Sequence, residues 1–169
     1  MVKKIAVRVL LLVLTAGAVA DTVTEYDLKA AYLLNFASYV EWPNPPEPIT
    51  ICVYGDNPFK AATIATLLEA KAGQIDADFK YPRQLEQLTD CKILYLALSE
   101  RENFGKAIDR LHNAPVLIVT DVQDGLPPGV MINLITESNR LTFEISINTV
   151  LASKLKISSK MLKLAKIVQ

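Results

Sequence analysis

Residues 92–120 have the sequence KILYLALSERENFGKAIDRLHNAPVLIVT, and this stretch decides the fold class. A polar segment of helical length separates two apolar runs, Lys92–Leu98 and Val116–Thr120. Its first residues, Ser99-x-x-Glu102, match a capping box, which predicts a helix from there to about His112. Near-continuous apolar strands joined through a helix are typical of a parallel sheet buried on both faces. The stretch therefore predicts a β-α-β unit of an α/β protein.

The same alternation is found upstream of this unit. The apolar, β-branched run Ile49–Tyr54 predicts a strand, and the turn Gly55–Pro58 follows it. A helix is expected from Phe59 to about Glu69, because Asp56 or Asn57 could cap it and Pro58 suits its first turn. A weaker strand is expected at 75–80 and a short helix near 84–88.

The first predicted element after the leader is a helix over 25–40, in which apolar residues recur at helical spacing. Thr22-x-x-Glu25 can form a capping box at its start. The helix must end before Trp42-Pro43, since the residue before a proline disfavours the α conformation. Prolines 43, 45, 46 and 48 then form a stiff connector.

The C-terminal part departs from the alternation. Val130–Thr136 and Arg140–Ile147 flank a short polar gap and predict an antiparallel hairpin. The tail from Thr149 to Val168 predicts helix in one or two pieces, with a break expected at Ile157-Ser158. The stretch Leu155–Val168 is basic and amphipathic; contact with a partner or a membrane surface is the less favoured interpretation, and apolar residues that face the core are the favoured one. The expected fold is a three-layer α/β domain over 21–169, with a mostly parallel sheet flanked by helices, a C-terminal hairpin and a terminal helix.

Residues 1–20 have the anatomy of a secretory signal peptide. Lys3, Lys4 and Arg8 precede an apolar run that is too short to cross a bilayer. Ala18-Val19-Ala20 is a small-x-small cleavage site, so we expect cleavage after Ala20. Loss of three basic residues shifts the net charge from 0 to about −3, which argues against broad binding to nucleic acid.

The expected oxidation state of the two cysteines, Cys52 and Cys91, depends on whether the protein is exported. In an oxidising compartment an even count suggests a disulfide, whereas in a reducing one they would be buried thiols. They lack C-x-x-C spacing, and one histidine, His112, supplies too few partners for a Cys/His metal site. Phosphate-binding and nucleophile-elbow motifs are absent from the sequence. We therefore expect a protein that is not an enzyme, with no catalytic residue, metal or cofactor.

Two groups of residues are candidates for binding. Asp56, Asn57, Ser99 and Asp121 follow predicted parallel strands, whose carboxyl ends form the usual ligand crevice of such sheets. Helix capping and turn formation explain most of them without a ligand and are the favoured interpretation. The second group, Tyr32, Phe36, Tyr39 and Trp42, places aromatic rings along and after the first helix. Such rings usually pack on the sheet, but exposed aromatic residues also make hot spots for partners.

Asp121 at a strand end also invites comparison with the phosphoacceptor of a receiver domain. Export argues against that function, because the kinases that serve such domains are cytoplasmic. An undetected hydrolase is the least favoured alternative.

In sequence, the chain resembles the YfiR family over nearly all of its expected mature length. The resemblance rests on short segments whose order and spacing match: Ala31–Phe36, Val40–Pro43, Ile51–Phe59, Cys91–Tyr95, Leu117–Asp121, Ile132–Leu134, Phe143–Ile145 and Ile157–Leu162. The family's first cysteine pair corresponds to Cys52 and Cys91. A second pair near the terminal hairpin of the characterised type is absent here.

The resemblance implies a periplasmic α/β protein that represses an inner-membrane diguanylate cyclase by binding its periplasmic sensor region. It implies an outer-membrane lipoprotein as the partner that relieves repression, another membrane sensor as an alternative partner, and self-association into a homodimer. Cyclic-di-GMP output, and through it biofilm formation, would be the controlled quantity. The competing hypothesis from the residues is a periplasmic sensor that binds a small ligand at the carboxyl edge of the sheet.

Overall fold

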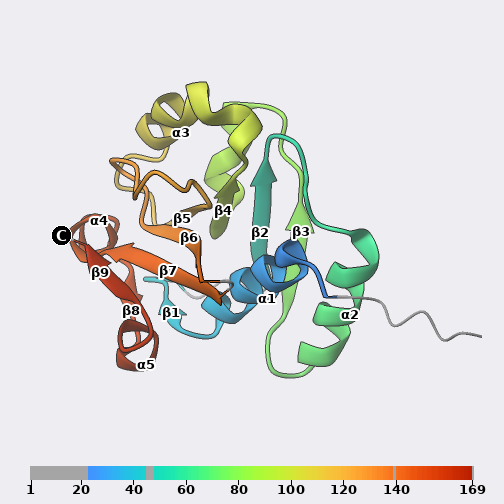
Figure 1. Ribbon diagram of the computed structural model, residues 1–169. Helices are drawn as coiled ribbons and strands as arrows, with labels where there is room; N and C mark the ends of the chain where they lie inside the picture. The colour runs from blue at the N-terminus through green and yellow to red at the C-terminus, as the bar shows by residue number, and fades with distance from the viewer. Residues whose placement is uncertain (1–22, 45–47, 139, 169) are drawn as a thin grey trace, which may run out of the picture.

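The computed structural model describes residues 23–44, 48–138 and 140–168, so the expected signal peptide lies outside the described residues. A seven-stranded sheet forms the centre, with the strand order β3-β2-β4-β5-β6-β7-β9 (Figure 1). Neighbouring strands run parallel except for the β6–β7 pair, which is an antiparallel hairpin. The expected fold class is confirmed. The strands are β2 (Ile49–Tyr54), β3 (Ala77–Lys80), β4 (Ile93–Leu96), β5 (Leu117–Thr120), β6 (Ile132–Glu137), β7 (Arg140–Ser146) and β9 (Lys166–Val168).

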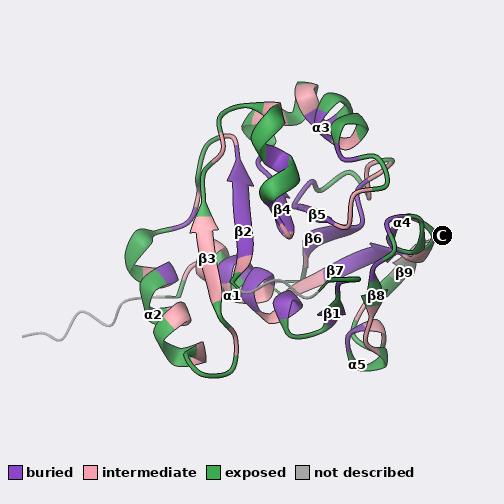
Figure 2. Ribbon diagram, turned by 180° about the vertical axis from the view of Figure 1, so that it is seen from behind, coloured by how far each residue is buried: buried purple, intermediate pink, exposed green. Residues whose placement is uncertain are grey.

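Helices cover both faces of this sheet. Helices α1 (Glu25–Ala37) and α2 (Ala61–Lys71) pack against each other, and α1 reaches β7 through the edge-to-face pair of Phe36 and Phe143. The opposite face carries α3 (Phe104–Arg110) and the 3-10 helix η1 (Leu85–Asp90), which contact each other. The central strands between these layers are buried, β4 and β5 at every position, whereas the edge strand β3 is only partly buried (Figure 2).

Helix α1 begins and ends close to the predicted positions. Its capping box is formed by Thr24 and Asp27, two residues after the pair that the sequence suggested. It ends at Ala37 instead of Val40, because Val40–Glu41 forms the short strand β1. No helix among the described residues is long and apolar enough to cross a membrane.

The predicted capping box at Ser99 is wrong. Residues Leu98–Asn103 form the 3-10 helix η2, whose N-cap is Ala97, and α3 begins only at Phe104. The Ser99 hydroxyl accepts a hydrogen bond from the backbone N–H of Asp56 instead. A contact across the sheet edge therefore replaced the local cap that the sequence pattern indicated.

The C-terminal hairpin is confirmed, and the tail contains two short helices interrupted at Ile157, where the sequence suggested a break, but its short strands were not predicted. The tail forms α4 (Ile147–Ala152), β8 (Lys156–Ile157), α5 (Ser159–Leu162) and finally β9. Strand β8 pairs antiparallel with β1, and β9 pairs parallel with β7 at the edge of the sheet. Strand pairing with partners far away in the sequence overrides a helical periodicity that only local spacing had suggested.

Candidate functional site

The loops that follow β2 and β4 lie directly against each other. The backbone N–H of Asp56 donates to the Ser99 hydroxyl over 2.8 Å. Gly55 has a φ of +105°, and a Cβ at this position would lie 2.6 Å from Ser99 Oγ and 2.8 Å from Glu100 Cγ. Glycine is required here because it tolerates positive φ and leaves room for the second loop. Asp56, Asn57 and Ser99 are thus gathered at one edge, as the strand order led us to expect.

Asn57 has a structural use within this loop. Its side-chain oxygen accepts from the backbone N–H of Phe59, and its amide group donates to the carbonyl of the same residue. This Asx-type turn starts the connection towards α2. The favoured interpretation of Asn57 as a turn residue agrees with these bonds.

A cavity of about 450 Å³ opens beside the Gly55 turn. It lies at the carboxyl end of β2, between the loop after β3 and the start of η2. From β2 the chain passes first to β3 on one side and later to β4 on the other, so this is the point where the strand order reverses. Ligands of open α/β sheets bind at such points. The cavity is lined by Tyr54, Gly55, Asp56, Asn57, Tyr81, Pro82, Arg83 and Glu100.

Of the four residues expected to form a pocket, Asp56 and Asn57 line this cavity and Ser99 does not. Asp121 does not line it either. It is 2% exposed, and its Oδ2 lies 2.6 Å from Nζ of Lys29, which is also 2% exposed. Lys29 Nζ also contacts Glu25 Oε1 at 2.6 Å. Helix α1 covers the end of β5 and supplies a cation there. The Asp121 carboxylate is therefore paired with Lys29 inside the protein.

Two tyrosines complete what we call the buried charge cluster, in which Lys29, Tyr95 and Asp121 are buried, Tyr26 is half-buried and Glu25 closes the exposed side. Lys29 Nζ lies 4.6 Å from the centre of the Tyr26 ring. Burial lowers the pKa of Lys29, but the bonds to Asp121 and Glu25 outweigh it and leave the pKa raised. Burial and the nearby Asp121 carboxylate raise the pKa of Tyr95. Lys29 is therefore held as a cation and Tyr95 as a neutral phenol, which ties α1 to the sheet by polar contacts.

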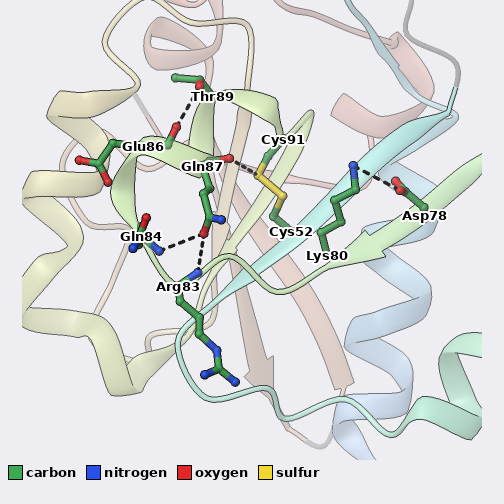
Figure 3. The surroundings of a disulfide bond; sticks show 9 residues. All are labelled: Cys52, Asp78, Lys80, Arg83, Gln84, Glu86, Gln87, Thr89 and Cys91. Carbon is green, nitrogen blue, oxygen red and sulfur yellow. Dashed lines mark hydrogen bonds and ion pairs between the residues drawn. A yellow bond between two sulfur atoms is a disulfide. The ribbon is translucent and has the colours of Figure 1, made fainter.

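The disulfide between Cys52 and Cys91 is present, with Cα atoms 5.7 Å apart (Figure 3). It links β2 to the residue two positions before β4, and both cysteines are buried. A smaller cavity of about 190 Å³ adjoins the bridge and shares Tyr81 and Pro82 with the larger one. In Figure 3 the side chain of Arg83 extends away from the disulfide. The bridge thus lies beside the loop that forms one wall of the larger cavity.

The four aromatic residues of the first helix fall into two classes. Phe36 and Trp42 are buried in the core, where no partner can reach them in this structure. Tyr32 is half-buried, packs edge-to-face on Phe36, and donates its hydroxyl to the carbonyl of Leu141. Tyr39 is 39% exposed. A surface for a partner can therefore use Tyr39 and part of Tyr32, whereas the other two stabilise the packing of α1.

The described residues offer no group of three or more His, Cys, Asp or Glu side chains that could hold a metal ion. His112 is exposed just after α3 and lies in none of the arrangements above. These side chains can therefore support binding through charge and shape, with the cavity at the β2 end as the open site.

A family model described as YfiR/HmsC-like matches residues 26–166. The chain belongs to the YfiR/HmsC-like family. The matched span runs from α1 into β9, so both cysteines, the cavity and most of the buried charge cluster lie within the YfiR/HmsC-like region. Proteins of the YfiR/HmsC-like family are periplasmic regulators, and the buried disulfide is consistent with that compartment.

Three residues of these sites were not predicted from the sequence. No sequence pattern predicts that Lys29 is buried, because one lysine on an amphipathic helix is normally solvated. Tyr81 and Arg83 fall between the weak strand at 75–80 and the short helix near 84–88, where the sequence predicts no function. Their proximity to Gly55 depends on β3 lying next to β2, which can be inferred from the parallel alternation but not from any local motif.

Proposed function

We propose that this protein represses an inner-membrane diguanylate cyclase by binding the cyclase's periplasmic sensor region. The single observation that carries the proposal is the YfiR/HmsC-like match over residues 26–166, which points to regulation of cyclic-di-GMP signalling. Another membrane sensor is the alternative partner.

Export to the periplasm is part of the proposal. Residues 1–20 would direct secretion and be removed after Ala20. The Cys52–Cys91 bridge supports this location, because such bonds persist in oxidising compartments. N-terminal sequencing of the protein from a periplasmic extract tests it. Asp21 is the expected first residue, and an intact Met1 would contradict the proposal.

Repression requires only that the inactive state of the cyclase binds this protein better than the active state does. Moving a two-state equilibrium from about 1:99 to 99:1 needs roughly a 10⁴-fold difference in affinity. Relief then follows when an outer-membrane lipoprotein competes for the repressor. The repressor itself does not have to contact the nucleotide.

Tyr39 is the residue through which a docking surface on α1 is best tested. It is the most exposed of the four aromatic candidates and lies at the corner between α1 and β1. Its backbone carbonyl accepts from Ser158, so the side chain can be shortened without removing that bond. Tyr39→Ala removes the ring, whereas the matched variant Tyr39→Phe keeps it. The proposal includes a homodimer, because two copies would present two Tyr39 surfaces to the partner.

The deciding experiment measures cyclic-di-GMP with a reporter in a strain that lacks the gene. Deletion should raise the signal, the wild-type gene should restore it, and deletion of the cyclase in the same background should abolish the rise. If Tyr39 docks the partner, Tyr39→Ala restores repression poorly and Tyr39→Phe restores it well. An unchanged reporter signal after deletion, in a strain shown to make the protein, would contradict repression.

A further inference from the structure

The cavity at the end of β2 contains opposite charges that do not neutralise each other. Arg83 supplies a guanidinium group, while Asp56 and Glu100 supply carboxylates. Neither carboxylate comes within 4.0 Å of the Arg83 guanidinium, the limit for an ion pair. One oxygen of Glu100 accepts from the side chain of Asn103, and the carboxylate of Asp56 has no partner among the described residues. Arg83 and Asp56, both with exposed side chains, therefore line the cavity without forming an ion pair.

The remaining walls provide shape and apolar surface. Tyr54 is buried at the end of β2, whereas Tyr81 exposes 47% of its surface at the rim. Burial, followed by the negative charges of Glu100 and Glu86, raises the pKa of the Tyr54 hydroxyl, so this group remains a neutral donor. A volume of about 450 Å³ is within the range of small-molecule sites, which is roughly 300–1,000 Å³.

We propose that this cavity binds a small zwitterion, with the ligand's carboxylate at Arg83 and its ammonium group at Asp56 and Glu100. In the ligand, several bonds separate the carboxylate from the ammonium group. This separation is needed because the Arg83 guanidinium lies beyond ion-pair distance of the Asp56 and Glu100 carboxylates. The aliphatic part between them lies against Tyr54 and Tyr81. This site is independent of the repressor function and does not rest on it.

The arrangement selects against ligands that carry one charge. A simple anion meets Arg83 but also faces two carboxylates, and a simple cation faces the guanidinium. A zwitterion offers a carboxylate to Arg83 and an ammonium group that Asp56 and Glu100 share. The fixed position of the Gly55 turn, held by the Asp56–Ser99 hydrogen bond, keeps the carboxylate side in place before a ligand arrives.

The test is an NMR titration of the purified, disulfide-bonded protein with ω-amino acids of increasing length. The series is glycine, β-alanine, γ-aminobutyrate and ε-aminocaproate, with butyrate and butylamine as analogues that carry one charge. We expect one of the longer amino acids to shift the amide signals of Gly55, Asp56 and Arg83. Each analogue should bind at least about tenfold more weakly, the effect of losing one charge-assisted hydrogen bond.

Variants distinguish this site from weak binding elsewhere. Arg83→Gln and Asp56→Asn should each weaken binding of the preferred amino acid by at least about tenfold. Arg110→Gln removes an exposed arginine of α3 outside the cavity and should leave the affinity unchanged. The proposal is overturned if no member of the series shifts the cavity signals, if the analogues bind as well as the amino acids, or if Arg83→Gln has no effect. Repression of a cyclase can fail without affecting this result, because the titration contains no partner.

Discussion

Lys29 Nζ lies 2.6 Å from Asp121 Oδ2, and this buried contact joins the first helix to the end of β5 across 92 positions in the sequence. Charges removed from water destabilise a protein unless each is paired. The contact therefore fixes the position of α1 more narrowly than apolar packing does, since a shift of the helix would leave a buried charge without its partner. The same helix carries Tyr39, through which we propose to test docking.

Removing one member of this pair should destabilise the fold strongly. Lys29→Met leaves the Asp121 carboxylate buried without its cation, and we expect a loss of about 3–5 kcal/mol in the free energy of unfolding. Combining Lys29→Met with Asp121→Leu should recover most of that loss, because no charge is then stranded. Urea unfolding of the single and double variants measures both effects.

An exposed lysine provides the control for this experiment. Lys80 pairs with Asp78 at 3.6 Å, and the lysine side chain is 57% exposed. Lys80→Met should change the stability by under about 1 kcal/mol. A Lys29→Met variant as stable as Lys80→Met would show that the buried pair does not stabilise the position of α1.

The disulfide should contribute substantially to stability. It closes a loop across 39 positions, for which chain entropy in the unfolded state predicts roughly 3–4 kcal/mol. The double variant Cys52→Ala with Cys91→Ala should unfold at correspondingly lower urea concentration. Mass spectrometry under non-reducing conditions checks that the bridge is present in the wild type. Equal stability of reduced and oxidised wild-type protein would contradict this prediction.

Asp27 should make the stability depend on pH in the acid range. Hydrogen bonds from Thr63 and then Thr24 lower the pKa of its carboxyl group to about 2. A carboxyl group with a lowered folded-state pKa stabilises the protein above its unfolded pKa, about 3.9, and this contribution is lost as the pH falls through about 2. The stability difference between wild type and Asp27→Asn should therefore shrink between about pH 4 and pH 2.

Urea unfolding at several pH values measures this difference. Asp109→Asn, which removes an exposed carboxylate of α3, is the matched control for the loss of one negative charge. A difference between wild type and Asp27→Asn that stays constant, or grows, as the pH falls would have the wrong sign for a lowered pKa.

Gly55→Ala should disturb the edge between β2 and β4. The new Cβ would meet the side chains of Ser99 and Glu100 at a backbone φ of +105°. Gly73→Ala has similar backbone strain, with a φ of +79°, but its Cβ would have no atom within 4 Å. We expect Gly55→Ala to lose about 1–3 kcal/mol and Gly73→Ala to lose less, as measured by thermal unfolding. Equal losses would mean that backbone strain alone explains both variants.

The elements that sequence analysis located well are those in which local pattern and long-range packing agree. Ile49–Tyr54 was predicted with its observed bounds, since a continuous apolar run can be buried on both faces only as a central strand. The hairpin of β6 and β7 was found because its polar turn is short and local. The pair Cys52 and Cys91 followed from compartment chemistry, and the structure places Cys52 in β2 and Cys91 two positions before the adjacent strand β4.

The errors occurred where partners distant in sequence decide the structure. The terminal strand β9 exists because it pairs with β7, and its three residues carry no pattern that predicts this. Ser99 fits a capping motif but bonds to Asp56 across the sheet edge. Asp121 looked available for a ligand because Lys29, its partner, comes from an element at the other end of the chain. Local motifs cannot reveal such pairings before the topology is known.

The Cys52–Cys91 bridge also gives the molecule an unusual mechanical property. Helix α2, the edge strand β3 and the helix η1 all lie within the covalent ring that it closes. Tension applied to the two chain ends would pass through the bridge and bypass these elements. In a single-molecule pulling experiment, the oxidised protein should extend by roughly 130 Å less than the reduced protein, at about 3.3–3.6 Å per residue over the 39 positions. The residues between Cys52 and Cys91, which include the edge strand β3, would thus remain unextended while the rest of the chain is stretched.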